Sequence, residues 1–130
     1  MVIVDTSAWI NYFRGISNET TDKIESLGKN NLDLYTTGII VTEILAGLRN
    51  KDTFRQIKTE LSHLFHVDPR YPETYISAAN IYRKGRSRGI TIRKMIDCLI
   101  AQVAIENGLF LLHDDEDFIK IATFTDLKIY

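Results

Sequence analysis

The sequence has few of the features that mark secreted, membrane-spanning or disordered proteins. Cys98 is the only cysteine, so no disulfide can form within the chain. No apolar run approaches the roughly 18 residues that a membrane-spanning helix requires, and Asp5 interrupts the apolar stretch that a signal peptide would need. Two prolines, seven glycines and the lack of a low-complexity tract argue against a long linker. We therefore expect a protein of the cytoplasm with no part in the membrane.

An excess of charge of one sign is also lacking. The chain has 16 Lys and Arg against 17 Asp and Glu, with a net charge of −1. Domains that bind nucleic acid are usually basic, but several acids gathered in one pocket would leave the remaining surface positive. Net charge therefore excludes no class of partner. With 130 residues, 45% of them hydrophobic, the chain is long enough for one domain with a proper core.

Short apolar or alternating segments recur between segments of helical periodicity. They predict strands at 2–4, 32–36, 64–67, 109–112 and 127–129, separated by helices at 6–15, 17–28, 38–50, 52–63, 72–88 and 94–107 and by a helical turn that ends near 122. Alternating strands and helices form parallel sheets with right-handed crossovers. The expected fold is a single α/β domain over residues 1–130, with a parallel sheet of four or five strands between helices.

Asp5 directly follows the first predicted strand and precedes a helix on which Trp9, Ile10 and Phe13 recur at helical spacing. It should therefore lie at the carboxyl edge of the sheet, where open parallel sheets bind ligands. The alternative is that Asp5 only caps the helix, a role that Thr6 or Ser7 would also suit.

Two further carboxylates stand at unusual places in predicted helices. Glu43 lies in a largely apolar helix with no cation three or four residues away, so no local ion pair explains it; the alternative is that it faces outward. Asp97 lies in the first turn of the helix 94–107, near the same sheet edge. Arg93 and Lys94 precede it by four and three residues, so an ordinary ion pair is the competing explanation.

The segment HDDEDF follows the fourth strand and adds Asp114, Asp115 and Asp117 to this edge. Three neighbouring acids are also typical of a solvated turn. The position just beyond a strand makes Asp115 the first candidate to point inward and Asp117 the second.

Carboxylates from separate strand ends would repel one another if they shared a pocket. Two unit charges about 4 Å apart repel by about 4 kcal/mol at an effective dielectric constant near 20, so the pocket needs a cation. Carboxylate oxygens without His or Cys favour Mg²⁺ or Mn²⁺ over Zn²⁺. Such a site suits a metal-activated water that attacks a phosphodiester.

Four segments of the chain resemble the motifs of the PIN-domain ribonucleases, and most closely those of VapC-type toxins of toxin–antitoxin pairs: VDTSAWINYF, TEILAGLR, IRKMIDCLIAQVAIENGLFLL and HDDEDF. The resemblance covers essentially the whole chain. It implies a PIN-like α/β/α sandwich and a site for one or two divalent ions. The implied ligands are Asp5, Glu43, Asp97 and Asp115, with Asp117 as an additional candidate, Thr6 or Ser7 as a hydroxyl at the pocket, and Asp114 as a bystander.

The segment RKGRSRGITIRK, between Arg83 and Lys94, has six cations and no acid. Its cations suit contact with phosphates beside the acidic site, and the candidates are Arg86, Arg88, Arg93 and Lys94. The alternative is a solvated helix end, because basic residues are favourable at a helix C-terminus.

The resemblance further implies a structured RNA substrate, such as loops of tRNA or rRNA, and a homodimer. It also implies a VapB-like antitoxin, encoded upstream, that packs into a hydrophobic groove and reaches the active site. Candidate surfaces for these partners are Trp9, Tyr12 and Phe13, and the helix that carries Tyr75 and Tyr82. Each of these residues also suits an ordinary place in the core.

The sequence thus predicts a Mg²⁺- or Mn²⁺-dependent endoribonuclease that acts as a toxin. Two alternatives stay open. A phosphoryl-transfer hydrolase would use Asp5 as nucleophile, but it normally needs a second Asp where this chain has Ser7, and it does not need Glu43. A non-catalytic RNA-binding domain of the same fold would usually lose some of the four acids, which this chain retains.

Overall fold

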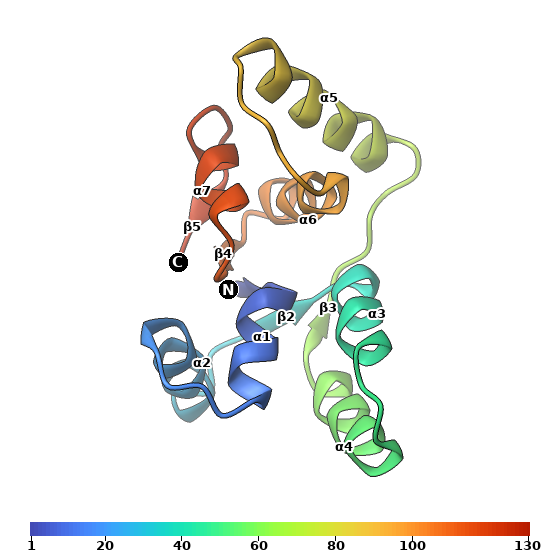
Figure 1. The fold of residues 1–130 in the computed structure, drawn as a ribbon, viewed down its shortest axis with the longest axis vertical. Helices are drawn as coiled ribbons and strands as arrows, with labels where there is room; N and C mark the ends of the chain where they lie inside the picture. Colours follow the sequence, from blue (N-terminus) through green and yellow to red (C-terminus); the bar gives the residue numbers. More distant parts are fainter.

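The computed structural model describes residues 1–130 and is built on a parallel sheet (Figure 1). The strands are β1 (Val2–Val4), β2 (Leu34–Thr36), β3 (Phe65–His66), β4 (Phe110–Leu112) and β5 (Lys128–Ile129). They form one five-stranded sheet in the order β3-β2-β1-β4-β5. The helices are α1 (Thr6–Phe13), α2 (Glu19–Lys29), α3 (Gly38–Ala46), α4 (Lys51–Ser62), α5 (Glu73–Ser87), α6 (Met95–Glu106) and α7 (Glu116–Ala122).

Helices cover both faces of the sheet, as expected from the alternating pattern. In Figure 1, α1, α2 and α4 lie on one side of the sheet, and α5, α6 and α7 lie on the other. The central strand β1 is buried on both faces, with Val2, Ile3 and Val4 at most 3% exposed. An apolar strand of this kind is typical of a parallel sheet covered on both sides. The predicted α/β sandwich is confirmed.

The order of the strands reverses at β1. The chain continues from β1 to β2 on one side, whereas β4 pairs with β1 on the other side, with Ile3 opposite Leu111. In open parallel sheets, ligands bind beyond the carboxyl ends of the strands at such a switch point. The residues that follow β1 and β4, including Asp5 and the segment 113–117, therefore lie at the favoured position for a site.

Every predicted strand and helix is present, and polar side chains cap several helix starts. Asp5 caps α1, Asn18 caps α2 in a capping box with Thr21, and Asn50 caps α4. In each case the capping side chain belongs to the last extended residue, from which it reaches an N–H group of the first turn. After α6, Gly108 has a φ of +64°, the left-handed conformation in which a glycine commonly ends a helix.

The helix α6 is the most deeply packed helix of the site. Ala101 and Ala104 are fully buried, and these small side chains let the helix lie close against its neighbours, as predicted. No helix of the chain has both the length and the apolar content that crossing a membrane demands.

Candidate active site

Asp5 sits between β1 and α1 and is 4% exposed. Its Oδ2 accepts hydrogen bonds from the Ser7 backbone N–H at 2.9 Å and from the Ser7 hydroxyl at 2.6 Å. Both interpretations of Asp5 from the sequence therefore hold, because the residue caps α1 and also lies at the acidic edge. The Ser7 hydroxyl fixes the orientation of this carboxylate.

Asp97, in the first turn of α6, is the least compensated acid of the group. It is 2% exposed, and its buried Oδ2 has no hydrogen-bond partner. Lys94 Nζ lies 3.9 Å from that oxygen, too far for a hydrogen bond. Burial raises the pKa of Asp97 to about 7; Lys94 opposes this rise, whereas Asp5, Asp115 and Asp117 add to it.

Asp115 and Asp117 complete a cluster with Asp97, in which one carboxylate oxygen from each residue lies within 4.8 Å of the others. Asp115 caps α7 and accepts from the Asp117 N–H at 3.0 Å. Asp117 is fully buried. The sequence analysis ranked Asp115 ahead of Asp117, whereas the structure brings a carboxylate oxygen of each close to Asp97.

Three cations lie against this cluster, and one of them, Lys120, donates from Nζ to Asp117 at 3.2 Å. Arg93 donates from Nη2 to Asp115 at 2.9 Å and from its backbone N–H to Asp117 at 2.9 Å. Lys94 Nζ lies 3.3 Å from Asp115 Oδ2. Although burial alone would raise the pKa values of Asp115 and Asp117, the Asp117 N–H and Lys94 lower the pKa of Asp115, and Arg93 and Lys120 lower the pKa of Asp117. Arg93 and Lys94 were predicted to meet RNA phosphates, and the structure pairs them with the acids.

Glu43 lies on α3, outside the cluster of three aspartates, and is only partly buried. Its Oε1 accepts a hydrogen bond of 2.9 Å from the Thr6 hydroxyl. Thr6 therefore connects α1 to α3 and sets the position of Glu43 at the rim of the site.

Asp114 is more than the expected bystander. Its backbone N–H donates to the Ser7 hydroxyl at 3.0 Å, and that hydroxyl in turn donates to Asp5. The Asp114 carboxylate accepts three further hydrogen bonds, from Asn11 (2.7 Å), Asn18 (3.2 Å) and Thr20 (2.6 Å). The residue ties the loop after β4 to α1 and α2. Nothing in the local sequence signals this role, because its partners lie about a hundred positions earlier.

The two remaining candidates, Arg86 and Arg88, are exposed at the end of α5. The Arg86 guanidinium lies 5.8 Å from the centre of the Tyr82 ring. Neither arginine forms an ion pair. Both stay available for an external anion.

The chemistry of the acidic site fits a hard divalent cation. Its ligand atoms are carboxylate oxygens, the type that Mg²⁺ and Mn²⁺ prefer. The buried Asp97 Oδ2 lacks a partner, and a buried polar atom without a partner is costly unless a cation compensates it. The residues present therefore suit a metal site formed around Asp97.

A comparison with protein families gives a match of residues 2–123 to the model of the PIN domain. The chain belongs to the PIN-domain family. Among curated proteins, this PIN domain is 33% identical over 129 residues to the VapC ribonuclease Mb1587 of Mycobacterium bovis and to the ribonuclease VapC11 of Mycobacterium tuberculosis. Each match covers 98% of this chain and 96% of the relative. The PIN domain is thus a member of the VapC ribonucleases.

Solved structures share the fold at lower identity. VapBC2 from Rickettsia felis, bound to a DNA fragment from its promoter, has a TM-score of 0.78 and 18% identity, and the match covers 100% of this chain and 98% of that one. FitAcB from Neisseria gonorrhoeae has a TM-score of 0.75 and 21% identity, with 100% and 96% covered. These likenesses establish the PIN fold.

Proposed function

We propose that this PIN domain is a Mg²⁺- or Mn²⁺-dependent endoribonuclease and the toxin of a type II toxin–antitoxin pair, which cleaves structured RNA in loops. The observation that carries the proposal is the buried, unpartnered Asp97 Oδ2 beside Asp115 and Asp117, at the point where the strand order reverses. The identity to VapC ribonucleases along nearly the whole chain supports it.

Asp5, Glu43, Asp97 and Asp115 are the proposed ligands, with Asp117 as an additional candidate because it shares the cluster of Asp97 and Asp115. When bound, a divalent ion supplies the charge that activates a water and stabilises phosphate oxyanions. The chain's own contribution is to hold the acids in place. Ser7 orients Asp5 through two hydrogen bonds, and Arg93 keeps Asp117 ionised by donating to it at 2.9 Å.

The two alternative functions receive less support. A phosphoryl-transfer hydrolase with Asp5 as nucleophile would need a second Asp at the position of Ser7, and Ser7 instead holds Asp5 Oδ2 through two hydrogen bonds. A non-catalytic domain would have no use for a buried acid whose pKa is raised to about 7, because an uncompensated buried carboxylate destabilises the fold.

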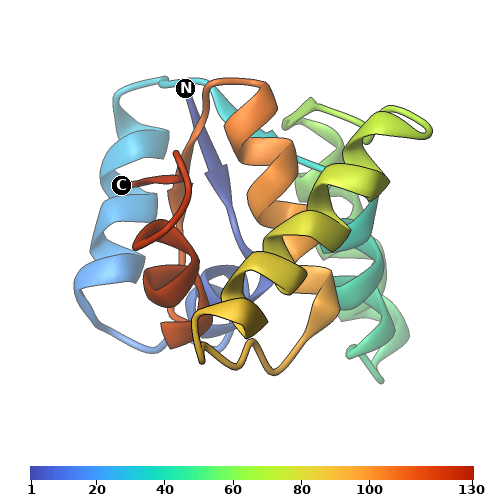
Figure 2. The ribbon, with the colours of Figure 1, turned by 90° about the horizontal axis from the view of Figure 1, so that it is seen from above.

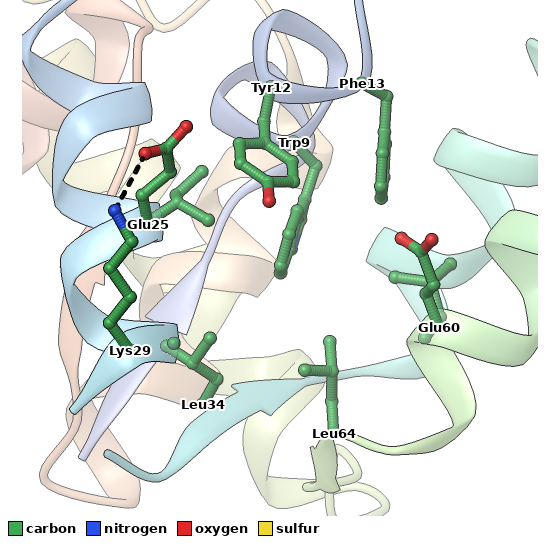
Figure 3. Close-up of a pocket in the computed structure, with 11 residues that line it drawn as sticks. Trp9, Tyr12, Phe13, Glu25, Lys29, Leu34, Glu60 and Leu64 are labelled. Carbon is green, nitrogen blue, oxygen red and sulfur yellow. Dashed lines mark ion pairs between the residues drawn. The ribbon is translucent and has the colours of Figure 1, made fainter. Parts of the chain in front are cut away.

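A VapB-like antitoxin, encoded upstream, is the proposed protein partner. Trp9, Tyr12 and Phe13 project from α1 into a cavity of about 590 Å³ between α1, α2 and α4 (Figure 3). An apolar groove lined by aromatic rings suits an inserted peptide segment. Several similar structures are described as VapBC or toxin–antitoxin complexes.

The proposed homodimer uses the outer face of α5 and the start of α6. Tyr75, Ile76 and Met95 are 46%, 58% and 53% exposed, and the adjoining cavity of about 420 Å³ is lined by apolar residues alone. Exposed apolar surface of this kind marks an interface.

The proposed activity is tested by RNA cleavage with and without metal. Wild-type protein should cut RNA in Mg²⁺ or Mn²⁺ and lose the activity in excess chelator. Asp97→Asn and Asp5→Asn should each abolish cutting. Asn caps a helix as well as Asp does, so Asp5→Asn should keep the cap of α1 while it removes the charge. Glu116→Gln is the matched control, because Glu116 is an exposed neighbouring acid outside the cluster.

A second readout separates the metal site from the activity. Mn²⁺ should raise the melting temperature of the wild type, since a ligand that binds only the folded state stabilises it, and should not raise that of Asp97→Asn. Cleavage that persists in chelator, or in both Asn variants, would overturn the mechanism.

A further inference from the structure

We infer that a groove at the start of α4 binds the single-stranded part of the RNA substrate. The groove, called here the α4 basic groove, has a volume of about 480 Å³ and is lined by Leu48, Arg49, Asn50, Lys51, Phe54, Arg55 and Lys58. The inference rests on the proposed ribonuclease function. It adds a binding path for the RNA strand outside the acidic cluster. These residues belong neither to the acidic site nor to the basic segment between Arg83 and Lys94.

The cations of the α4 basic groove are not used by the protein itself. Arg49, Lys51 and Lys58 form no ion pair. Arg55 reaches Asp52 only at 4.0 Å, with both side chains largely exposed. Lys51 occupies the first helical position of α4, where the helix dipole disfavours a cation. Since these charges contribute little to folding, their gathering points to an external polyanion.

An aromatic ring lies among these charges. Lys51, Phe54, Arg55 and Lys58 are spaced i, i+3, i+4 and i+7 along α4, so they share one face of the helix. Phe54 is 38% exposed on that face. Cations that follow a phosphate backbone together with an exposed ring for base stacking are the combination that binds single-stranded nucleic acid. An acidic peptide would pair with the cations but would leave the ring unused.

The groove lies at the same end of the molecule as the acidic site. In Figure 2, the turn between α3 and α4 projects at the end where α6 begins, and Asp97 lies in the first turn of α6. Glu43 is three residues before the end of α3, or about 4.5 Å of helix rise. The helix α3 therefore leads from Glu43 towards the residues that line the α4 basic groove.

The other unpaired cations complete the path. Apart from Lys128 on β5, the cations without an ion pair form two groups. The group at the end of α5 consists of Arg83, Lys84, Arg86 and Arg88. The group beside α4 consists of Arg14, Arg49, Lys51 and Lys58. In Figure 1, α6 lies between α5 and the pair α3 and α4. An RNA strand that contacts both groups would pass over α6, whose first turn carries Asp97.

The test measures binding of a labelled single-stranded oligouridylate to protein in the Asp5→Asn background, in which cutting is blocked. The triple variant Arg49→Gln, Lys51→Gln, Lys58→Gln should weaken binding about tenfold or more at low salt. It should also reduce the slope of log K against log salt by about 2, since each phosphate contact contributes about 0.7. Phe54→Leu should weaken binding about fivefold with the slope unchanged, because stacking is lost but no charge is.

The matched control is Lys23→Gln with Lys128→Gln, which removes two cations away from α4 and should leave affinity nearly unchanged. Wild-type affinity and salt slope in the triple variant would overturn the inference. It would also be overturned if an oligoglutamate competed as well as unlabelled RNA, because the groove would then be assigned to an acidic protein segment. A wild type that fails to cut RNA in Mg²⁺ would instead overturn the proposed function, while the binding measurement would still decide on the groove.

Discussion

At the scale of single residues, the burial of Asp97 has a consequence for stability that is separate from catalysis. In the unfolded chain Asp97 loses its proton near its ordinary pKa of 3.8, and in the folded protein near 7. Between these values the folded state binds more protons than the unfolded state. The contribution of Asp97 to the free energy of unfolding therefore falls as pH rises from about 4 to about 7, and is constant above that range.

We predict that, in chelator, Asp97→Asn melts at a higher temperature than the wild type at pH 8, and that this gap closes towards pH 4. Each pKa unit corresponds to about 1.4 kcal/mol, which limits the gain to about 4 kcal/mol. Asp115 and Asp117 act in the opposite direction, because their lowered pKa values stabilise the fold above their ordinary pKa and lose that effect in acid. The wild type and Asp97→Asn share this effect, so it cancels in the difference between their melting temperatures. Thermal melts over the pH range test this, and parallel curves would contradict the burial argument.

The residues of the site differ in how far sequence could predict them. Asp5 and Asp97 follow from local signals, since one ends a strand and the other begins a helix. The sequence favoured Asp115 over Asp117, but it could not show that both lie near Asp97, because that depends on how α7 packs beside α6 in the tertiary fold. The role of Asp114 could not be seen either, since Asn11 and Thr20 approach it only through the tertiary fold.

At the scale of elements, hydrophobic periodicity was enough to place every strand and helix. Its limit was at helix starts, where several polar residues compete for one cap. Asn50 caps α4 because its backbone is extended and its Oδ1 accepts from the N–H groups of Asp52 and Thr53. Such a choice depends on backbone angles that spacing does not specify.

The groove formed by α1, α2 and α4 has a charged rim that constrains its partner. Figure 3 shows Glu25 paired with Lys29 on one side of the aromatic row, and Glu60 on the other side. Glu60 forms no ion pair. An antitoxin segment that fits should therefore be apolar, with a basic residue facing Glu60.

We predict that Phe13→Glu and Glu60→Lys each weaken the complex with the antitoxin by tenfold or more, while RNA cutting by the free toxin stays at the wild-type rate. Phe13→Glu places a charge in the apolar floor, and Glu60→Lys repels the basic residue. Ile16→Glu is the control, since Ile16 is an exposed apolar residue that does not line the groove. Calorimetric titration of the purified antitoxin measures the effect. Unchanged affinity in Glu60→Lys, whose exposed side chain the fold does not need, would exclude this groove.

At the scale of the whole molecule, charge is segregated although the total is close to zero. The acids that the site needs lie at the carboxyl edge of the sheet, and most unpaired cations lie on the elements beside it. Composition could not show this separation, since a net charge of −1 is equally consistent with evenly mixed charges. The apolar surface is segregated in the same way, with one part in the α1–α2–α4 groove and another on α5 and α6.

The α5–α6 surface leads to a prediction about the assembly. Ile76 is 58% exposed on α5, beside Tyr75 and Met95, and a second copy that covers this face would remove these side chains from water. We predict that the wild type sediments at about twice its chain mass of 14.9 kDa and that Ile76→Glu sediments as a single chain with its helical content intact. Ile119→Glu is a matched control, because Ile119 on α7 has the same exposure of 58% but lies outside this surface. A wild type that stays a single chain at high micromolar concentration, or a dimer that both variants disrupt equally, would show that the α5–α6 face is not the interface.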